Sequence, residues 1–170
     1  MKRWYQLLAH LLITGLLTAL VPACAGPGTA VDNQPISVAV WDLEDLSPIA
    51  HGNPGIGEFM AAKITARVNG MKAYQAVERQ QLLKAIEELN IGSSDLADTR
   101  TRLKLGRIIG ARQMVFGAFQ VAGSSLRLDL RRVDVASGKI LKTGTGSASA
   151  DSVSGWLSAA DHAAVELMAP

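Results

Sequence analysis

Two spacings of hydrophobic residues divide residues 36–168 into strands and helices. Alternating or nearly continuous apolar stretches that are rich in β-branched residues predict strands. Apolar residues that recur every three or four positions predict helices. The predicted strands cover 36–43, 74–78, 113–121, 126–135 and 139–145, and the predicted helices cover about 56–68, 79–90, 99–109 and 152–168. This β-α-β-α-α-β-β-β-α order predicts an α/β (α+β) domain in which three to four helices cover a mixed sheet of about five strands.

The helix pattern also predicts where the helices end and which side chains face inward. Asn69-Gly70 and Gly110 are expected helix ends, because these residues tolerate the left-handed conformation that often follows a helix. The apolar residues expected on the inner faces of the first three helices are Ile56, Phe59, Met60, Ile64, Val68, Leu82, Leu83, Ile86, Leu89, Leu103, Leu105, Ile108 and Ile109.

The strand at 126–135 changes the phase of its alternation. Its apolar residues occupy 126, 128 and 130, and then 133 and 135, with Arg131-Arg132 between the two sets. A β-bulge at this point would restore one buried face. The arginine pair therefore indicates a solvated edge or a bulge, and docking of a partner protein is the alternative role for Arg131 and Arg132.

The first 24 residues have the features of a lipoprotein signal peptide. Lys2 and Arg3 precede a nearly uncharged run rich in leucine, as in a signal peptide. Val21-Pro22-Ala23-Cys24 resembles the lipobox, in which the chain is cut before the cysteine and the thiol receives a diacylglycerol. We therefore expect a signal peptide at 1–23, a lipidated tether at 24–35 and one domain at 36–170. Cleavage after Ala25, which would release a soluble secreted chain, and an uncleaved membrane anchor are the alternatives.

Charge and cysteine content narrow the possible partners. The chain has 17 basic and 15 acidic residues, and removal of Lys2 and Arg3 with the signal peptide leaves 15 of each. This balance argues against nucleic-acid binding, which usually needs a clustered excess of basic residues. Cys24 is the single cysteine, so no intramolecular disulfide can form. Membrane association would then depend on the lipid, and no cofactor is expected.

Few residues suggest catalysis. Asp42, Glu44 and Asp45 follow the first strand, where ligands often bind in open α/β sheets, and His51 follows in the same loop. A hydrolase or metal site would require Asp42 and His51 to converge. The sequence contains no Gly-x-Ser-x-Gly or His-Glu-x-x-His pattern, and 52–57 lacks the lysine of a nucleotide-binding loop. We therefore predict a protein that is not an enzyme and binds no metal, with His162 exposed on the last helix.

Four segments between residue 36 and about residue 141 carry a family resemblance. They are Val-Ala-Val-Trp-Asp-Leu at 38–43, Val-Glu-Arg at 77–79 followed by Leu82-Leu83 and Glu87-Glu88, Leu-Gly at 105–106 leading through Gly110-Ala111 to Val-Phe-Gly at 115–117, and Leu-Arg-Arg-Val-Asp-Val at 130–135 followed by Ser-Gly-Lys-Ile. In order and spacing they resemble the CsgG-like family of bacterial outer-membrane lipoproteins, which is related to the amino-terminal domain of TolB and to FlgO-type flagellar lipoproteins.

The resemblance implies a periplasm-facing outer-membrane lipoprotein that self-associates or docks to an envelope assembly. It does not extend to the long insertions that form the curli pore, because a membrane strand needs about 9 to 11 residues and the links at 122–125 and 137–138 are short. Glu78 and Arg79 are expected to fix the junction between strand and helix by a local ion pair, with ligand contact as the alternative. Gly106 and Gly110 are expected to permit close helix packing and a left-handed cap.

Two functions fit these observations. The first is an assembly or accessory component of an envelope or secretion complex. The second is a regulator that reaches from the outer membrane to a periplasmic enzyme, as the lipoprotein activators of peptidoglycan synthases do. The tether favours the first, because it spans at most about 35 Å when fully extended, which is short for crossing the periplasm.

Overall fold

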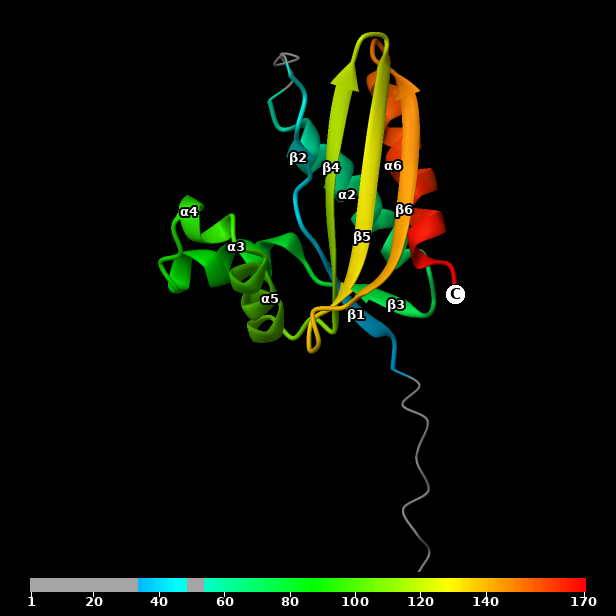
Figure 1. Cartoon of the computed structure of the whole chain (residues 1–170). Helices are drawn as coiled ribbons and strands as arrows, with labels where there is room; N and C mark the ends of the chain where they lie inside the picture. The colour runs from blue at the N-terminus through cyan, green and yellow to red at the C-terminus, as the bar shows by residue number, and fades with distance from the viewer. Residues whose placement is uncertain (1–33, 49–53) are drawn as a thin grey trace, which may run out of the picture. The chain divides into compact units, whose positions relative to one another are not determined.

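One mixed sheet organises the domain in the computed structural model, which describes residues 34–48 and 54–170. Its strands lie in the order β3-β1-β4-β5-β6, and β2 pairs separately with the second half of β4. The strands at the β3 side run parallel, whereas β4, β5 and β6 form an antiparallel meander (Figure 1). The bounds are β1 Ile36–Val40, β2 Glu44–Asp45, β3 Tyr74–Ala76, β4 Gln113–Ala122, β5 Ser125–Asp134 and β6 Ile140–Ser149.

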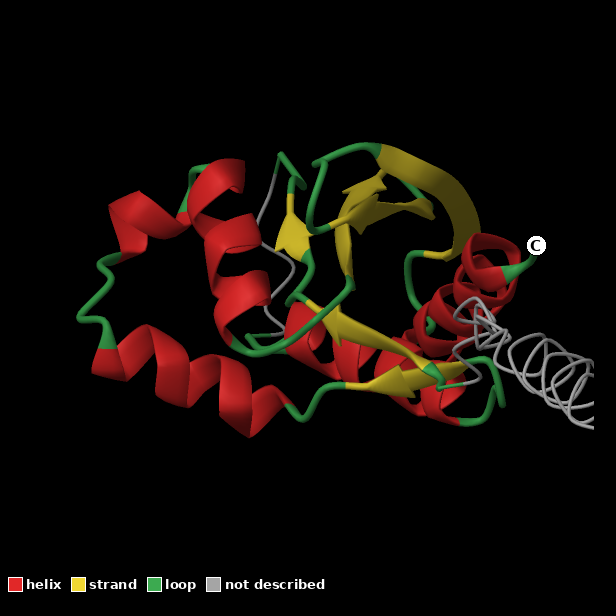
Figure 2. Ribbon diagram, turned by 90° about the horizontal axis from the view of Figure 1, so that it is seen from below, coloured by secondary structure: helices red, strands yellow, loops and turns green. Residues whose placement is uncertain are grey.

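Five helices in the described residues form two groups. Helices α2 and α6 lie together behind the sheet, whereas α3, α4 and α5 form a separate helical lobe beside it (Figures 1 and 2). Their bounds are α2 Ile56–Asn69, α3 Arg79–Glu88, α4 Ser93–Leu96, α5 Thr99–Ile108 and α6 Val153–Met168. The predicted α/β class and element order are confirmed, with the short β2 and α4 as additions. None of the helices in these residues is long and apolar enough to span a membrane.

The two groups of helices create cores on opposite faces of the sheet. The main core lies between the sheet and the α2–α6 pair and contains Ile64, Leu128 and Trp156. Asp161 of α6 binds Arg67 of α2 across this pair, and the hydrogen bonds from Arg67 lower the pKa of Asp161. A smaller core on the opposite face consists of Ala39, Ala111, Met114, Phe116, Val133 and Val135.

The two cores explain the change of phase in β5. Leu126, Leu128 and Leu130 face the main core, whereas Val133 faces the smaller one. A register shift does occur between Arg132 and Val133, but the residue skipped in the pairing is Leu141 of β6. The prediction that a bulge restores a single buried face is therefore wrong, because both faces of β5 are covered near its end.

The helix ends and inner faces differ in part from expectation. Gly110 has a φ of +73° after α5, which confirms the predicted left-handed cap. Gly70 has a φ of −73°, so α2 stops without a left-handed residue, and the Asn69 side chain instead accepts a hydrogen bond from the Ala76 N–H. The residues predicted to face inward that are exposed instead are Phe59, Leu83, Leu89 and Ile108.

Candidate interaction surface

The antiparallel half of the sheet leaves one face uncovered, and this face contains a groove. The groove has a volume of about 460 Å³. Strands β4, β5 and β6 form its floor, β2 borders it, and α5 contributes a side chain from the helical lobe. The lining residues are Glu44, Leu46, Arg102, Phe116, Gly117, Ala118, Asp129, Leu130, Arg131, Ile140, Thr143, Gly144 and Thr145.

Arg102 fixes the wall of the groove on the side of the helical lobe. Its guanidinium binds the Glu44 carboxylate at 2.7 Å and donates to the Leu96 carbonyl at 2.5 Å. The same group lies 5.6 Å from the centroid of the Trp41 ring and 5.8 Å from that of Phe116. One buried arginine thus joins β2, the end of α4 and the sheet, so the position of this wall is set by charge and stacking together.

Arg131 gives the groove a positive charge that is not neutralised. Its guanidinium stacks 5.6 Å from the centroid of the Phe116 ring, and no carboxylate in the described part of the chain pairs with it. The nearby Asp129 is bound by Arg127 at 2.9 Å. Leu46 and Ile140 on the groove are each 59% exposed. The surface therefore combines one available cation, a stacked aromatic ring and exposed aliphatic side chains, which suits a partner that carries a carboxylate beside apolar groups.

Comparison with known proteins identifies the family of this chain. The model of the family described as "Curli production assembly/transport component CsgG" matches residues 29–125, which is more than half of the chain. The chain belongs to the CsgG family. No curated protein matches it.

Solved structures with the same fold share little sequence with this CsgG-family chain. The LpoB C-terminal domain from Salmonella enterica has 18% identity and a TM-score of 0.56, over 68% of this chain and 85% of that one. Lipoprotein GNA1162 from Neisseria meningitidis has 21% identity and a TM-score of 0.52, over 68% and 81%. The PelC dodecamer from Paraburkholderia phytofirmans has 15% identity and a TM-score of 0.54, over 80% and 89%. At these identities the likeness establishes the fold alone.

The two adjacent arginines considered as interaction residues have different environments in this CsgG-family domain. Arg131 is exposed on the groove, whereas Arg132 is 8% exposed on the opposite face of β5. The Arg132 guanidinium donates to the Tyr74 hydroxyl at 2.5 Å and lies over the ring. A partner can thus reach Arg131, while Arg132 belongs to the interior. Its interpretation as a solvated residue is wrong, because strand alternation directs it toward the α2–α6 side.

The pairing predicted between Glu78 and Arg79 is also corrected. Arg79 binds Asp42 at 2.8 Å and Glu58 at 3.2 Å, so it connects the start of α3 with the segment that follows β1 and with α2. The hydrogen bonds that Arg79 donates to the Asp42 carboxylate raise the pKa of Arg79. Glu78 precedes α3 and makes no side-chain capping bond. The junction is thus fixed by ion pairs, but the partners of Arg79 are distant in sequence.

The acidic residues after β1 participate in structural contacts. Asp42 pairs with Arg79, Glu44 pairs with Arg102, and Asp45 accepts a hydrogen bond from the Ser47 N–H at 2.9 Å. His51 and Cys24 lie outside the described residues. Within residues 34–48 and 54–170, no three histidine, cysteine or carboxylate side chains form a group suited to a metal ion. His162 is exposed on α6, as predicted.

Two groove residues, Arg102 and Phe116, were not predicted as site residues from the sequence. Arg102 lies three positions before the fully buried Leu105 and shares its inner face, but its charge argued for exposure. Phe116 was expected in a strand, without any sign that two arginines would stack on it. Gly106 fulfils the packing role predicted for it, since a Cβ there would come within 2.5 Å of the Met114 sulfur.

Proposed function

We propose that this protein is a non-catalytic accessory lipoprotein of the bacterial outer membrane that binds another envelope protein. Membership of the CsgG family supports an envelope role. A lipobox-like segment ending in Cys24 supports a lipid anchor on the periplasmic side of that membrane. The proposed domain organisation is a signal peptide at 1–23, a tether at 24–35 and the α/β domain at 36–170.

The observation that carries the binding role is the groove with Arg131 at its floor. An arginine that stacks on a buried aromatic ring is held in place before binding, so a partner loses less conformational entropy by pairing with it. The partner we propose is a protein segment that brings a carboxylate to Arg131 and apolar side chains to Leu46 and Ile140. Arginine is one of the residues enriched at the energetic centre of protein interfaces.

Photo-crosslinking from the groove tests this role in cells. A photoreactive residue at Thr143 should give one discrete adduct with a second protein, whereas the same residue at Glu87 on the helical lobe should not. We expect Arg131→Glu to reduce that adduct about tenfold or more, because a charge-assisted hydrogen bond contributes about 1.5–3 kcal/mol. Arg131→Lys keeps the positive charge but loses the planar stacking on Phe116, so it should reduce the adduct less than Arg131→Glu does. An adduct that is unchanged by Arg131→Glu, or whose mass equals two copies of this chain, contradicts the proposed partner.

The lipid anchor has its own test. The native protein should have an amino terminus at Cys24 with added acyl mass and should partition into detergent. Cys24→Ala should abolish the added mass and release the chain to the aqueous phase, since acyl chains provide the membrane affinity. Intact mass spectrometry with detergent partitioning measures both. A native chain that starts at Gly26 without acyl mass would instead establish a soluble secreted protein.

A further inference from the structure

Basic side chains gather around the point where the chain enters the sheet. The Ile36 N–H donates to the Ala73 carbonyl at 2.9 Å, which places Lys72 beside the first residue of β1. On the other flank of β1, the Arg112 N–H donates to the Ser37 carbonyl at 3.0 Å. The first two residues of β1 therefore have a cationic residue on each side.

Hydrogen bonds connect two further cations to this end. The Arg112 carbonyl accepts from the Val135 N–H at 3.0 Å, and the Arg107 side chain donates to the Val135 carbonyl at 3.2 Å. The turn between β5 and β6 is closed by the Asp134 N–H, which donates to the Lys139 carbonyl at 2.9 Å. Arg107 and Lys139 thus lie next to Arg112.

Lys142 completes the group on the side of α6. Its ammonium donates to the Ala169 carbonyl at 3.2 Å and to a backbone oxygen of Pro170 at 2.8 Å. Tyr74, which is opposite Ile36 in the sheet, donates its hydroxyl to the Met168 carbonyl at 3.2 Å. The five cations around the start of β1, called the basic end below, are Lys72, Arg107, Arg112, Lys139 and Lys142.

In the described part of the chain, Asp134 and Glu166 lie at or near this end, and neither pairs with Lys72 or Lys139. Asp134 lies within it, and hydrogen bonds from Ser137 lower the pKa of Asp134 and keep it ionised. The Glu166 carboxylate, at the end of α6, accepts a hydrogen bond from the Thr145 N–H of β6. Lys72 and Lys139 are exposed and have no carboxylate partner within the described part of the chain. Glu44, Asp45, Asp129 and Asp151 lie toward the far end of the sheet, and Glu58 lies in the first turn of α2.

We propose that the basic end rests on an anionic phospholipid surface. This inference relies on the proposed anchor at Cys24, from which the chain can extend at most about 35 Å before it reaches Gln34. Because the chain enters the domain at the basic end, a lipid at Cys24 holds that end toward the membrane. Ile108 and Leu141 are 51% and 46% exposed beside the cations, and basic residues mixed with aliphatic ones suit the headgroup region.

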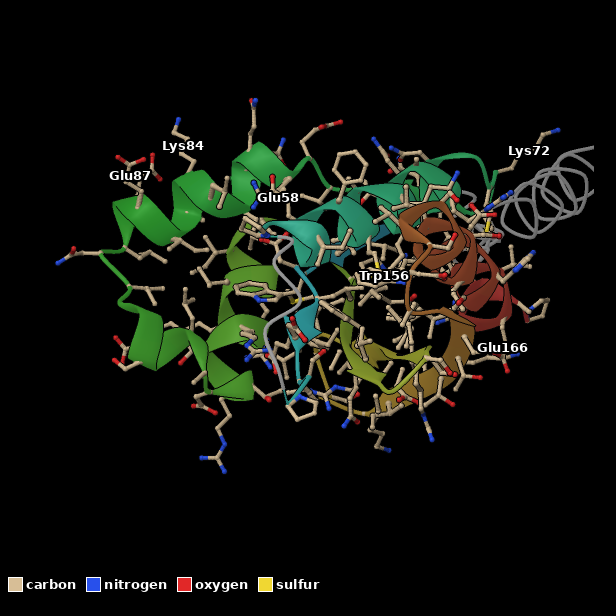
Figure 3. The ribbon with its side chains drawn as sticks, turned by 90° about the horizontal axis from the view of Figure 1, so that it is seen from above. Glu58, Lys72, Lys84, Glu87, Trp156 and Glu166 are labelled. Atoms are coloured by element: carbon tan, nitrogen blue, oxygen red, sulfur yellow. The ribbon has the colours of Figure 1, made fainter. Side chains whose placement is uncertain are left out.

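Vesicle binding by the unlipidated chain tests this surface without the anchor. The mature Cys24→Ser protein is mixed with vesicles of phosphatidylethanolamine and phosphatidylglycerol, or with zwitterionic phosphatidylcholine vesicles. Each basic residue near an anionic surface changes the affinity about fivefold, so Lys72→Gln with Lys139→Gln should weaken binding about 25-fold. The matched control is Lys84→Gln with Arg100→Gln on the helical lobe, where Lys84 lies far from Lys72 (Figure 3).

The expected result is binding to anionic vesicles that falls with added salt, is lost in the Lys72/Lys139 variant and persists in the control. Equal binding to both kinds of vesicle, equal losses in the two variants, or no binding to anionic vesicles at low salt would overturn the proposal. The salt dependence of the parent chain gives an answer even if a variant folds poorly. Acyl mass on Cys24 is scored separately on the native protein, so failure of the anchor and failure of the basic end are distinguishable.

Discussion

Gly144→Val is expected to lower the free energy of unfolding by about 3 kcal/mol, which is a large share of the stability of a domain of this size. A Cβ at Gly144 would lie 2.3 Å from the Ala163 carbonyl oxygen and 3.1 Å from the backbone nitrogen of Leu167. Both are backbone atoms of α6, so no side-chain rotation relieves the clash. Urea denaturation followed by circular dichroism measures the change.

Ser147→Val is the matched control for this substitution. Ser147 lies on the same strand but is exposed on the uncovered face, so the added bulk meets no helix. Valine also has a higher strand propensity than either residue that it replaces. We expect the control to change stability by less than about 0.5 kcal/mol. A loss in Gly144→Val no larger than in Ser147→Val would show that α6 does not pack as closely on β6 as the structure indicates.

Two glycines, Gly144 and Gly146, explain why the predicted last strand ends earlier than β6 does. The sequence predicts a strand at 139–145, whereas β6 extends from Ile140 to Ser149. Gly144 and Gly146 weaken the local strand signal, because glycine contributes no side chain to the pattern. Their role depends on contact with α6, since a Cβ at Gly146 would lie 2.5 Å from the Ala159 carbonyl oxygen. No local pattern contains that information.

The elements with strong periodicity could be predicted, and those positioned by tertiary contacts could not. The long strands were predicted because β4 is a nearly continuous apolar run and the apolar residues of β5 alternate over many positions. Helices α3 and α5 of the helical lobe were predicted as helices, but the exposed Leu83 and Leu89 of α3 were assigned to an interior. That error arises because α3 and α5 pack mainly on each other around Leu82, Ala85 and Leu105, so each buries only a narrow stripe.

The candidate surface could be predicted only in part. The break in alternation at Arg131-Arg132 drew attention to both residues, and one of them lies on the groove. Which of the two faces outward follows from the strand pairing and from the covering of both sheet faces, and neither property can be read from a single strand. Arg102 and Arg131 both stack on the Phe116 ring. Arg102 belongs to a helix that was predicted to present only apolar residues inward.

Arg102→Leu is expected to lower the free energy of unfolding by about 2–3 kcal/mol. The substitution removes a charged hydrogen bond to the Leu96 carbonyl and stacking on Trp41, while leucine replaces part of the apolar contact. The lost pair with Glu44 contributes less, because the Glu44 side chain is 48% exposed and screened by solvent. We also expect faster amide hydrogen exchange in α4, because the Leu96 carbonyl at the end of this helix loses its hydrogen bond from Arg102.

Arg132→Met provides the contrast that makes this prediction specific. Arg132 is also a buried arginine, but no carboxylate in the described residues pairs with it, and its Nε is buried without an acceptor. Replacing a buried, unneutralised cation with an apolar side chain of similar length removes a desolvation cost, so stability should remain within about 1 kcal/mol or increase. Tyr74 can still donate to the Met168 carbonyl. If urea denaturation gave equal losses for Arg102→Leu and Arg132→Met, burial alone would explain both, and Arg102 would lose its assigned role in fixing the groove wall.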